Sequence, residues 1–317
     1  MNGTMSTMKL LTGTSNIDLS QKVSGFLGVP ITPMDVKRFA DGEVFTEIKD
    51  SIRGEDVYLI QSTCYPVNEN LMELLIILDT CKRASARSIN VIIPYFGYAR
   101  QDRKVTPRTP ITARLVSDLL ETAGATRVLS VDLHSGQIQG FFNMPFDNIY
   151  AAPVLLNKLQ TAYQGQKITI VSPDAGGVDR ARWFASKLNA SLAIVDKRRS
   201  APNEAKVMHL IGDVKDSVAL IVDDMIDTAG TLCNTAAAVK ENGAIKVIAA
   251  ATHGVFSGPA LSRIHESVLD EVYITDSIPQ TAKVANVSKI KILSISSLLG
   301  EAIRRIHLRE SVSSLFI

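Results

Sequence analysis

The clearest chemical signal in the chain is an apolar segment, residues 219–222, that ends at the paired carboxylates of Asp223 and Asp224. A short loop follows, and then a segment of helical character over residues 232–241. A loop that joins a strand to a helix N-terminus binds anions, because unpaired N–H groups and the helix dipole face the ligand. The loop residues that add a carboxylate, hydroxyl donors and close backbone approach are Asp227, Thr228, Ala229, Gly230 and Thr231.

The paired carboxylates indicate what kind of anion this loop binds. Carboxylates are poor ligands for a phosphate, but they accept hydrogen bonds from the vicinal hydroxyls of a sugar. The alternative is an Asp-rich turn that only caps the helix. The added Asp-Thr-x-Gly-Thr pattern favours a binding site, and the loop is predicted to hold a ribose phosphate.

Charged residues and glycines also follow four other strand-like segments. Ligands of open parallel sheets collect beyond the carboxyl ends of the strands, so these residues are expected to share one crevice with the sugar loop. Together they suit phosphates, a divalent cation and a sugar. They are Arg100-Gln101-Asp102-Arg103-Lys104, Asp132 with His134, Asp174 with Gly176-Gly177, and Lys197-Arg198-Arg199.

Each of these groups has a purely structural alternative. Asp174-Ala-Gly-Gly177 can cradle an anion and leave Asp174 to hold a hard cation, or it can simply turn a strand into a helix. His134 is either a core histidine or, beside Asp132 at a strand end, a site residue. The basic run from Lys197 is either a solvated patch or a group that reaches over the crevice, and the segment 200–203 after it is predicted to be a mobile flap.

Nine apolar segments of strand length set the expected architecture. Most are uninterrupted β-branched or aliphatic runs, as in strands buried on both faces of a parallel sheet. Helical patterns lie between them, for example at residues 70–84 and 111–123. An α/β fold with helices covering the sheets is therefore predicted. The strand segments are residues 57–61, 89–93, 128–131, 168–171, 192–195, 219–222, 247–251, 272–274 and 290–293.

The chain is long enough for two domains, and parts of it echo each other. It has 317 residues, of which 46% are hydrophobic. Gly124 to Val128 resembles Gly243 to Val247, and a Pro-x-x-Gly pattern after residue 93 resembles one after residue 172. Two related α/β domains, residues 1–150 and 151–317, are predicted. Residues 1–7 are polar and small and are expected to be dispensable.

Composition excludes several classes of function. The net charge is only +2, which fits a small anionic ligand better than a nucleic acid. Three scattered cysteines, Cys64, Cys81 and Cys233, predict a reducing compartment without disulfides. No apolar run is long enough to span a membrane, and no signal pattern begins the chain, so a cytoplasmic enzyme is expected. No P-loop motif is present, so any ATP is held in another way.

With these loops in view, the chain from Met8 onward resembles the bacterial type of ribose-phosphate pyrophosphokinase, also called phosphoribosyl pyrophosphate synthetase. The sugar loop alone is shared with phosphoribosyltransferases, and its combination with Arg-Gln-Asp-Arg-Lys and Asp-Lys-Arg-Arg is specific. The segments that carry the resemblance are Phe39-Ala-Asp-Gly-Glu43, Pro66-Val-Asn-Glu-Asn-Leu-Met-Glu73, Tyr98-Ala-Arg-Gln-Asp-Arg-Lys104, Asp132-Leu-His134, Gln139-Gly-Phe-Phe142, Ser172-Pro-Asp-Ala-Gly-Gly177, Asp196-Lys-Arg-Arg199, Val222 to Thr231 and Thr252-His-Gly-Val-Phe-Ser257.

The resemblance implies a reaction and a fold. The family transfers the diphosphoryl group of ATP to the anomeric hydroxyl of ribose 5-phosphate, which gives AMP and phosphoribosyl pyrophosphate for nucleotide biosynthesis. It implies two similar phosphoribosyltransferase-like domains, each with a mainly parallel sheet flanked by helices, and last residues that pack back on the first domain. It also implies a homo-hexamer in which the loop at Phe39 serves a neighbour's site.

The resemblance also assigns roles to residues of this sequence. ATP is expected at Phe39, Asp41, Gly42, Glu43, Arg100 and Gln101. Ribose 5-phosphate is expected at Arg199, Asp223, Asp224, Asp227, Thr228, Ala229, Gly230 and Thr231. Mg²⁺ is expected at His134 and Asp174, although histidine is an unusual ligand for this hard cation. Lys197 and Arg199 are the expected catalytic cations, because a loose phosphoryl-transfer transition state needs positioning and charge, not a nucleophile.

The sequence departs from the family pattern at two places. Val105-Thr-Pro-Arg-Thr109 stands where family members often have Ala-Arg-Ser-Arg-Glu, which bears on regulation by phosphate and ADP. Ala229 stands where the family often has glycine. The alternatives are a phosphoribosyltransferase, which would not need Arg100 and Gln101, and a non-catalytic regulatory homologue, which should have lost the sugar-loop carboxylates or the basic run.

Overall fold

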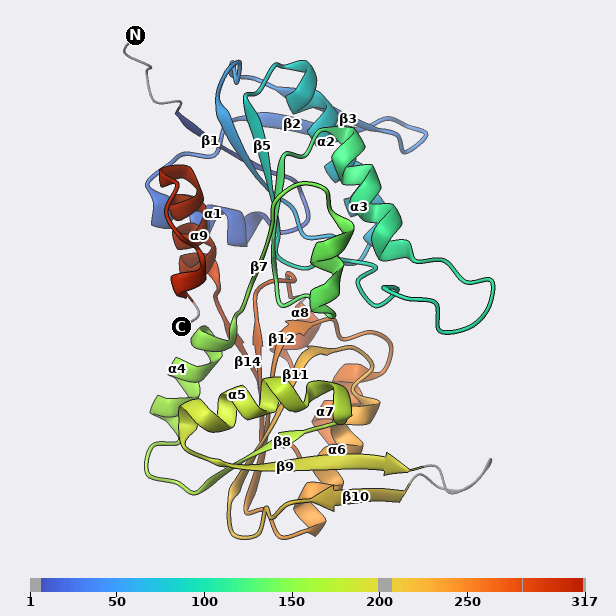
Figure 1. The fold of residues 1–317 in the computed structure, drawn as a ribbon, viewed down its shortest axis with the longest axis vertical. Helices are drawn as coiled ribbons and strands as arrows, with labels where there is room; N and C mark the ends of the chain where they lie inside the picture. The colour runs from blue at the N-terminus through green and yellow to red at the C-terminus, as the bar shows by residue number, and fades with distance from the viewer. Residues whose placement is uncertain (1–6, 199–206, 281, 316–317) are drawn as a thin grey trace. The chain divides into compact units, whose positions relative to one another are not determined.

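The computed structural model describes residues 7–198, 207–280 and 282–315. The chain is an α/β protein whose contacts divide it into two compact units (Figure 1). Unit 1 comprises Met1–Tyr150, Ser277–Pro279 and Ile295–Ile317, and unit 2 comprises Ala151–Asp276 and Gln280–Ser294. The α/β class predicted from the uninterrupted apolar segments is therefore confirmed.

Unit 1 is built on a sheet of five parallel strands in the order β1-β4-β5-β6-β7. Two further strands, β2 and β3, form a separate antiparallel hairpin. The strands are β1 (Met8–Thr12), β2 (Met34–Arg38), β3 (Val44–Ile48), β4 (Asp56–Ile60), β5 (Ser88–Ile93), β6 (Arg127–Val131) and β7 (Phe146–Ile149).

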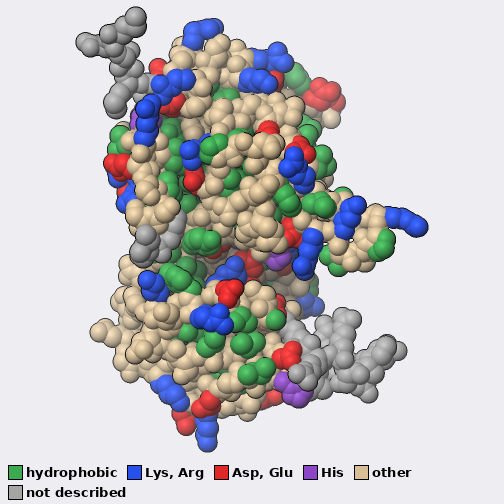
Figure 2. All heavy atoms as spheres, viewed as in Figure 1, with side chains coloured by type: hydrophobic (Ala, Val, Ile, Leu, Met, Phe, Trp, Pro, Cys, Tyr) green, Lys and Arg blue, Asp and Glu red, His purple; other side chains and the backbone are tan. Residues whose placement is uncertain are grey.

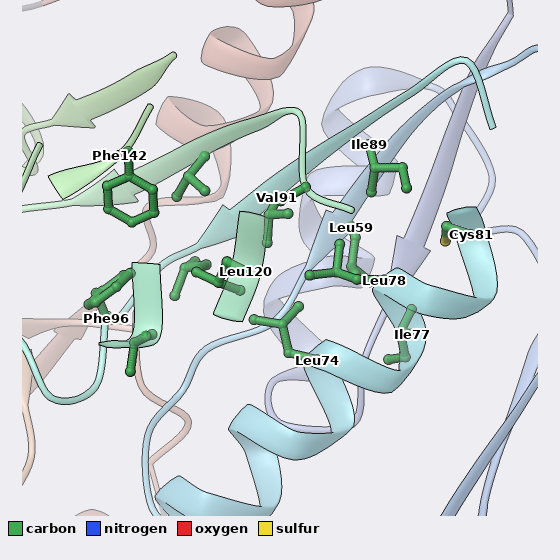
Figure 3. Close-up of a cluster of buried hydrophobic side chains, with 14 of the residues drawn as sticks. Leu59, Leu74, Ile77, Leu78, Cys81, Ile89, Val91, Phe96, Leu120 and Phe142 are labelled. Atoms are coloured by element: carbon green, nitrogen blue, oxygen red, sulfur yellow. The ribbon is translucent and has the colours of Figure 1, made fainter. Parts of the chain in front are cut away.

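Helices cover both faces of this sheet. On one face α2 (Val67–Arg83) and α3 (Thr112–Ala123) contribute Leu74, Leu78 and Leu120 to a buried cluster with Leu59 and Val91 of the strands (Figure 3). Helices α1 (Ile17–Leu27) and α9 (Ser296–Leu308) lie side by side elsewhere on the unit. Residues 295–308 thus belong to unit 1 although the chain has passed through unit 2.

Unit 2 is built on seven strands in the order β10-β9-β8-β11-β12-β13-β14, and only the β9–β10 pair is antiparallel. Alternate side chains along the strands pack into two separate hydrophobic cores. The strands are β8 (Ile168–Ser172), β9 (Ser191–Arg198), β10 (Val207–Ile211), β11 (Val218–Ile226), β12 (Lys246–Gly254), β13 (Glu271–Thr275) and β14 (Ile290–Leu293).

The two cores of unit 2 explain why its strands read as continuous apolar runs. Leu220 and Val222 pack with α4 (Ala152–Ala162) and α5 (Val178–Leu188). Ala219 and Ile221 pack with α6 (Gly230–Glu241) and α7 (Ala260–Glu266). Because every second residue faces a different layer of helices, both faces of these strands take mainly apolar residues.

All nine predicted strand segments are strands, with one informative difference at β11. This strand continues to Ile226, so Asp223 and Asp224 belong to the strand and not to the loop after it. Helix α6 begins at Gly230, two residues before the predicted start, and α2 begins at Val67 instead of residue 70. Four strands of 4 or 5 residues, β1, β2, β3 and β7, and the antiparallel strand β10 were not predicted.

The two units share a strand order. With the antiparallel pairs β2–β3 and β9–β10 set aside, unit 1 reads β1-β4-β5-β6-β7 and unit 2 reads β8-β11-β12-β13-β14. In each unit, these five core strands follow one another across the sheet in chain order. The two sequence echoes instead pair β6 with β12 and β5 with β8, which hold different places in these orders. The echoes therefore do not mark the structural correspondence.

Candidate functional site

A pocket of about 190 Å³ in unit 2 contains most of the predicted sugar-loop residues. It lies where β8 and β11 end and α6 begins, which is the carboxyl edge of the parallel sheet. The residues of polar or loop character that line it are Pro173, Asp174, Asp223, Asp227, Thr228, Ala229, Gly230 and Thr231. The structure therefore brings Asp174 and the loop after β11 together at one pocket of this unit.

The backbone of the loop presents donors to this pocket. Ala229 has a left-handed conformation with φ 59° directly before α6, and its carbonyl accepts from the amide of Cys233 at 2.9 Å. Within the described part of the chain, no acceptor takes the amides of Thr228 and Ala229. The hydroxyl-bearing residues Thr228 and Thr231 are exposed. Free amides and hydroxyls at a helix N-terminus make a cradle for a phosphate.

Asp223 and Asp224 form a tightly coupled acidic pair beside this cradle. The backbone amide of Asp224 donates to Oδ1 of Asp223 at 2.9 Å, and Asp224 is the more buried of the two. Burial, and then the hydrogen bond and charge of Asp224, raise the pKa of Asp223 from 3.8 to about 7. Asp223 therefore gains its charge near neutral pH, where it becomes a strong acceptor for sugar hydroxyls.

Two arginines at this site were not predicted as site residues. Arg180 of α5 lies 3.5 Å from Oδ1 of Asp223 and 3.6 Å from Oδ1 of Asp224, and it opposes the rise in the pKa of Asp223. Arg263 of α7 donates from Nη1 to the carbonyl of Thr228 at 3.0 Å. Both lie on helices far along the chain from the loop, so no local motif could have linked them to it.

Asp174 presents a carboxylate at the edge of the pocket. It is exposed, and its carboxylate accepts from the amide of Gly177 at 3.1 Å at the start of a short 3-10 turn, η2 (Ala175–Gly177). The amide of Gly177 is therefore already hydrogen-bonded within the turn. The sequence alone also allows this amide to be part of an open, glycine-rich site for an anion.

The pocket suits a divalent cation that is held partly by substrate. Asp174, Asp223 and Asp227 all line it, and Mg²⁺ typically takes one or two carboxylates together with waters and phosphate oxygens. Among the described residues, no three Asp, Glu, His or Cys side chains are grouped closely enough to hold a metal by themselves. His134, the other expected ligand, is exposed directly after β6 and belongs to unit 1, whereas Asp174 belongs to unit 2.

Unit 1 contains a second polar pocket, of about 530 Å³, that includes Arg100 and Gln101. It lies at the start of α2, and the other residues that line it are Tyr65, Pro66, Val67, Asn68, Glu69, Tyr95, Gly97, Tyr98 and Ala99. The hydroxyl of Tyr98 donates to Oδ1 of Asn68, and the amide of Gly97 donates to Oγ1 of Thr63 at 2.7 Å. A cation, an amide and aromatic rings around one cavity suit a nucleotide.

The remaining expected ATP residues lie apart from this pocket, at the tip of the β2–β3 hairpin. Phe39 is 57% exposed, and its ring centre is 5.9 Å from that of Phe45. The tip is closed by hydrogen bonds from the amide of Phe39 to the carbonyl of Glu43 and from the amide of Glu43 to Asp41, with Gly42 at φ 96°. Neither Phe39 nor residues 41–43 line the pocket.

In unit 1, a buried glutamate of α2 binds groups that follow two neighbouring strands of the sheet. Glu73 is 1% exposed and accepts from the amide and the hydroxyl of Thr14, each at 2.7 Å, and from Nε2 of Gln61 at 2.9 Å. Thr14 follows β1 and Gln61 follows β4, the strands that hold the places of β8 and β11.

The two basic runs that the sequence analysis singled out lie in different parts of the chain. The loop between β5 and α3 projects from unit 1 and carries exposed Arg103, Lys104 and Arg108 (Figures 1 and 2). Residues 105–109, where the sequence differs from the family pattern, belong to this loop. Lys197 lies in the final part of β9, opposite Met208 of β10. Arg199 and the predicted flap at 200–203 lie outside the described residues.

The three cysteines differ in how far they are shielded from solvent. Cys64, Cys81 and Cys233 are free, and the first two are buried. Burial raises the pKa of Cys64 to about 11 and that of Cys81 to about 12, so neither is a reactive thiolate. None of the described helices is long and apolar enough to cross a membrane.

Comparison with known proteins identifies the family. Residues 8–124 match the model of the N-terminal domain of ribose phosphate pyrophosphokinase, and residues 197–317 match that of the phosphoribosyl synthetase-associated domain. The ribose-phosphate pyrophosphokinase of Brucella melitensis is 53% identical over 309 residues, which cover 98% of this chain and 100% of the relative. That of Hyphomonas neptunium is 54% identical over 310 residues, which cover 98% and 99%.

A solved structure agrees with this assignment over the whole fold. The crystal structure of phosphoribosylpyrophosphate synthetase from Mycobacterium smegmatis is similar with a TM-score of 0.91 and 41% identity. The similarity covers 96% of this chain and 100% of that chain. The chain described here therefore belongs to the ribose-phosphate pyrophosphokinase family of enzymes.

Proposed function

We propose that the chain catalyses the reaction for which its family is named: it transfers the diphosphoryl group of ATP to the anomeric hydroxyl of ribose 5-phosphate. The products are phosphoribosyl pyrophosphate and AMP. The observation that carries this proposal is the unit 2 pocket, where a phosphate cradle lies beside an acidic pair suited to sugar hydroxyls.

The sugar phosphate occupies the unit 2 pocket. The amides and hydroxyls of Thr228, Ala229, Gly230 and Thr231 bind its 5-phosphate, and Asp227 completes the loop. Asp223 accepts from the ribose hydroxyls, supported by Asp224 and Arg180. The rise in the pKa of Asp223 favours this role, because a ligand hydroxyl replaces the proton that the free carboxyl retains.

ATP occupies the unit 1 pocket at Arg100 and Gln101. Phe39 stacks on the adenine, and Asp41, Gly42 and Glu43 contact the nucleotide. The separation of the hairpin tip from the pocket supports a site that receives Phe39 from another copy, and hence a homo-oligomer, for which a hexamer is proposed. The cell compartment proposed for this reaction is the cytoplasm.

A divalent cation, proposed to be Mg²⁺, neutralises the charge of the triphosphate when it is bound. Asp174 and His134 are its proposed ligands, with waters and phosphate oxygens completing the shell. The carboxylate of Asp174 also holds the amide of Gly177, so its position is fixed before substrate arrives.

The chemical step joins the anomeric oxygen to the β-phosphorus of ATP while the bond from that phosphorus to the α,β-bridging oxygen breaks. AMP leaves with that oxygen, and the hydroxyl proton passes to solvent. Lys197 and Arg199 balance the charge on the group in transit. No side-chain nucleophile is needed, because the acceptor hydroxyl attacks directly.

The product assay tests this proposal. The purified chain, with Mg²⁺, ATP and ribose 5-phosphate, should form AMP only when the sugar phosphate is present. Lys197→Ala should lower turnover by about 100-fold to 1,000-fold, as for the loss of one preorganised donor, and leave ATP affinity within several-fold. Absence of AMP from the unmodified chain would exclude the proposed reaction, and a fully active Lys197→Ala variant would exclude the role of that lysine.

A further inference from the structure

Arg263 is an exposed residue of α7 whose guanidinium lies against the sugar-phosphate loop. Its Nη1 donates to the carbonyl of Thr228 at 3.0 Å. A Cβ atom placed on Gly230 would lie only 3.3 Å from the same Nη1. The guanidinium therefore packs closely on the loop at the residue that begins α6.

We propose that Arg263 is a positioning residue that holds this loop in the conformation that binds the 5-phosphate of the sugar. The inference rests on the proposed function of the loop and goes beyond it, because Arg263 lies outside the loop motif and acts through the backbone. In a trans peptide the carbonyl and the following N–H point in opposite directions. Fixing the carbonyl of Thr228 on Arg263 therefore also fixes the direction of the amide of Ala229.

The conformation at Ala229 explains why such a hold is needed. Its φ of 59° lies in the left-handed region, which a residue with a Cβ adopts at a cost in free energy. Without an external contact, the peptide between Thr228 and Ala229 has competing orientations of lower backbone energy. A charge-assisted hydrogen bond to the Thr228 carbonyl favours the observed orientation over those alternatives.

Arg263 can hold the loop because its own helix is fixed. Ala260 and Ile264 of α7 are completely buried in the core of unit 2. At the other end of the helix, Nζ of Lys289 donates to the carbonyls of Ile264, His265 and Ser267 at 3.3, 2.9 and 2.8 Å. The guanidinium thus projects from an anchored element onto the loop.

The test is a comparison of Arg263→Met and Arg263→Lys with the unmodified chain. Arg263→Met should raise KM for ribose 5-phosphate by about tenfold or more, since a charged hydrogen bond is lost, while kcat and KM for ATP stay within about threefold. Arg263→Lys keeps one donor and should recover part of the loss. Calorimetric titration of the variants with ribose 5-phosphate alone should show the same order of affinities.

Lys240→Met is the matched control. Lys240 is also an exposed cation of unit 2 that donates to a backbone carbonyl, that of Ile245 at 2.8 Å, but it lies at the far end of α6. Its replacement should leave both KM values unchanged. Melting temperatures of all variants separate loss of fold from loss of the loop conformation.

Three outcomes overturn the proposal: a KM for ribose 5-phosphate within twofold of the unmodified chain in Arg263→Met, an equal change in both KM values, or the same effect in Lys240→Met. Failure of the proposed function itself is recognised separately, because the unmodified chain would then form no AMP.

Discussion

At the scale of single residues, the chemistry of the sugar site depends on where Asp223 stands in the fold. It belongs to the last part of β11, next to Asp224 and within 3.5 Å of Arg180. Burial and the neighbouring carboxyl raise its pKa to about 7, which couples ligand binding to pH. Its sequence position beside Asp224 hints at such coupling, but the partner Arg180 and the burial come only from the fold.

The raised pKa predicts the sign of the pH dependence. The free protein keeps a proton on Asp223 below the raised pKa, and this proton must leave before the carboxylate accepts from the sugar. Affinity for ribose 5-phosphate should therefore rise with pH, by up to about tenfold per unit, and level off above the raised value. Calorimetric titrations across this range measure it.

Asp223→Asn is the control, because the ligand's own phosphate also titrates in this range. The variant should show only the weaker slope that comes from the phosphate. The same shift has a consequence for stability: the folded chain holds a proton that the unfolded chain releases, so Asp223 lowers stability as the pH rises from 3.8 towards 7. Equal slopes in the variant and the unmodified chain would show that Asp223 does not titrate in the binding step.

At the scale of elements, the site is a strand, a loop and a helix in sequence. The apolar segment 219–222 and the residues after it were sufficient to predict the strand and the loop. They could not place the strand end, because Asp223 and then Met225 and Ile226 continue the ladder with β12 although acidic residues are typical of turns. The helix start at Gly230 was also hidden, since Ala229 provides no side-chain cap.

Ala229 gives a prediction at this scale. Its left-handed φ costs about 1 kcal/mol for a residue with a Cβ, so Ala229→Gly should be neutral or slightly stabilising and keep activity. Ala229→Val should lower the free energy of unfolding by more than about 1 kcal/mol, because a β-branched residue fits this region poorly and the position is 5% exposed. Thermal unfolding and KM for ribose 5-phosphate measure both effects. A Val variant with the melting temperature and KM of the unmodified chain would contradict this view of the loop.

At the scale of the whole molecule, two units with one strand order have pockets at equivalent places. The unit 1 pocket lies at the start of α2, which follows β4, and the unit 2 pocket lies at the start of α6, which follows β11. The sequence indicated two related domains through its length and its two local echoes, yet the echoes joined strands that do not correspond. Strand order depends on pairing between segments distant in the chain, and no short motif encodes it.

The hairpin tip at Phe39 supports a prediction about assembly. Phe39→Ala and Lys197→Ala should each be nearly inactive alone. When both are co-expressed with different tags and purified through both tags, mixed oligomers should recover activity, because some sites combine an intact Phe39 from one copy with an intact Lys197 from another. Mixed oligomers that stay as inactive as their parents would show that Phe39 serves the site of its own copy.

The central claim, that the group transferred to the sugar contains the β-phosphorus of ATP, is tested most directly by label transfer. The chain is incubated with Mg²⁺, ribose 5-phosphate and ATP radiolabelled at its β-phosphate, and the products are separated. The account predicts that the label moves to phosphoribosyl pyrophosphate while unlabelled AMP accumulates in equal amount. Label retained in ADP would show transfer of a single phosphoryl group and would contradict it.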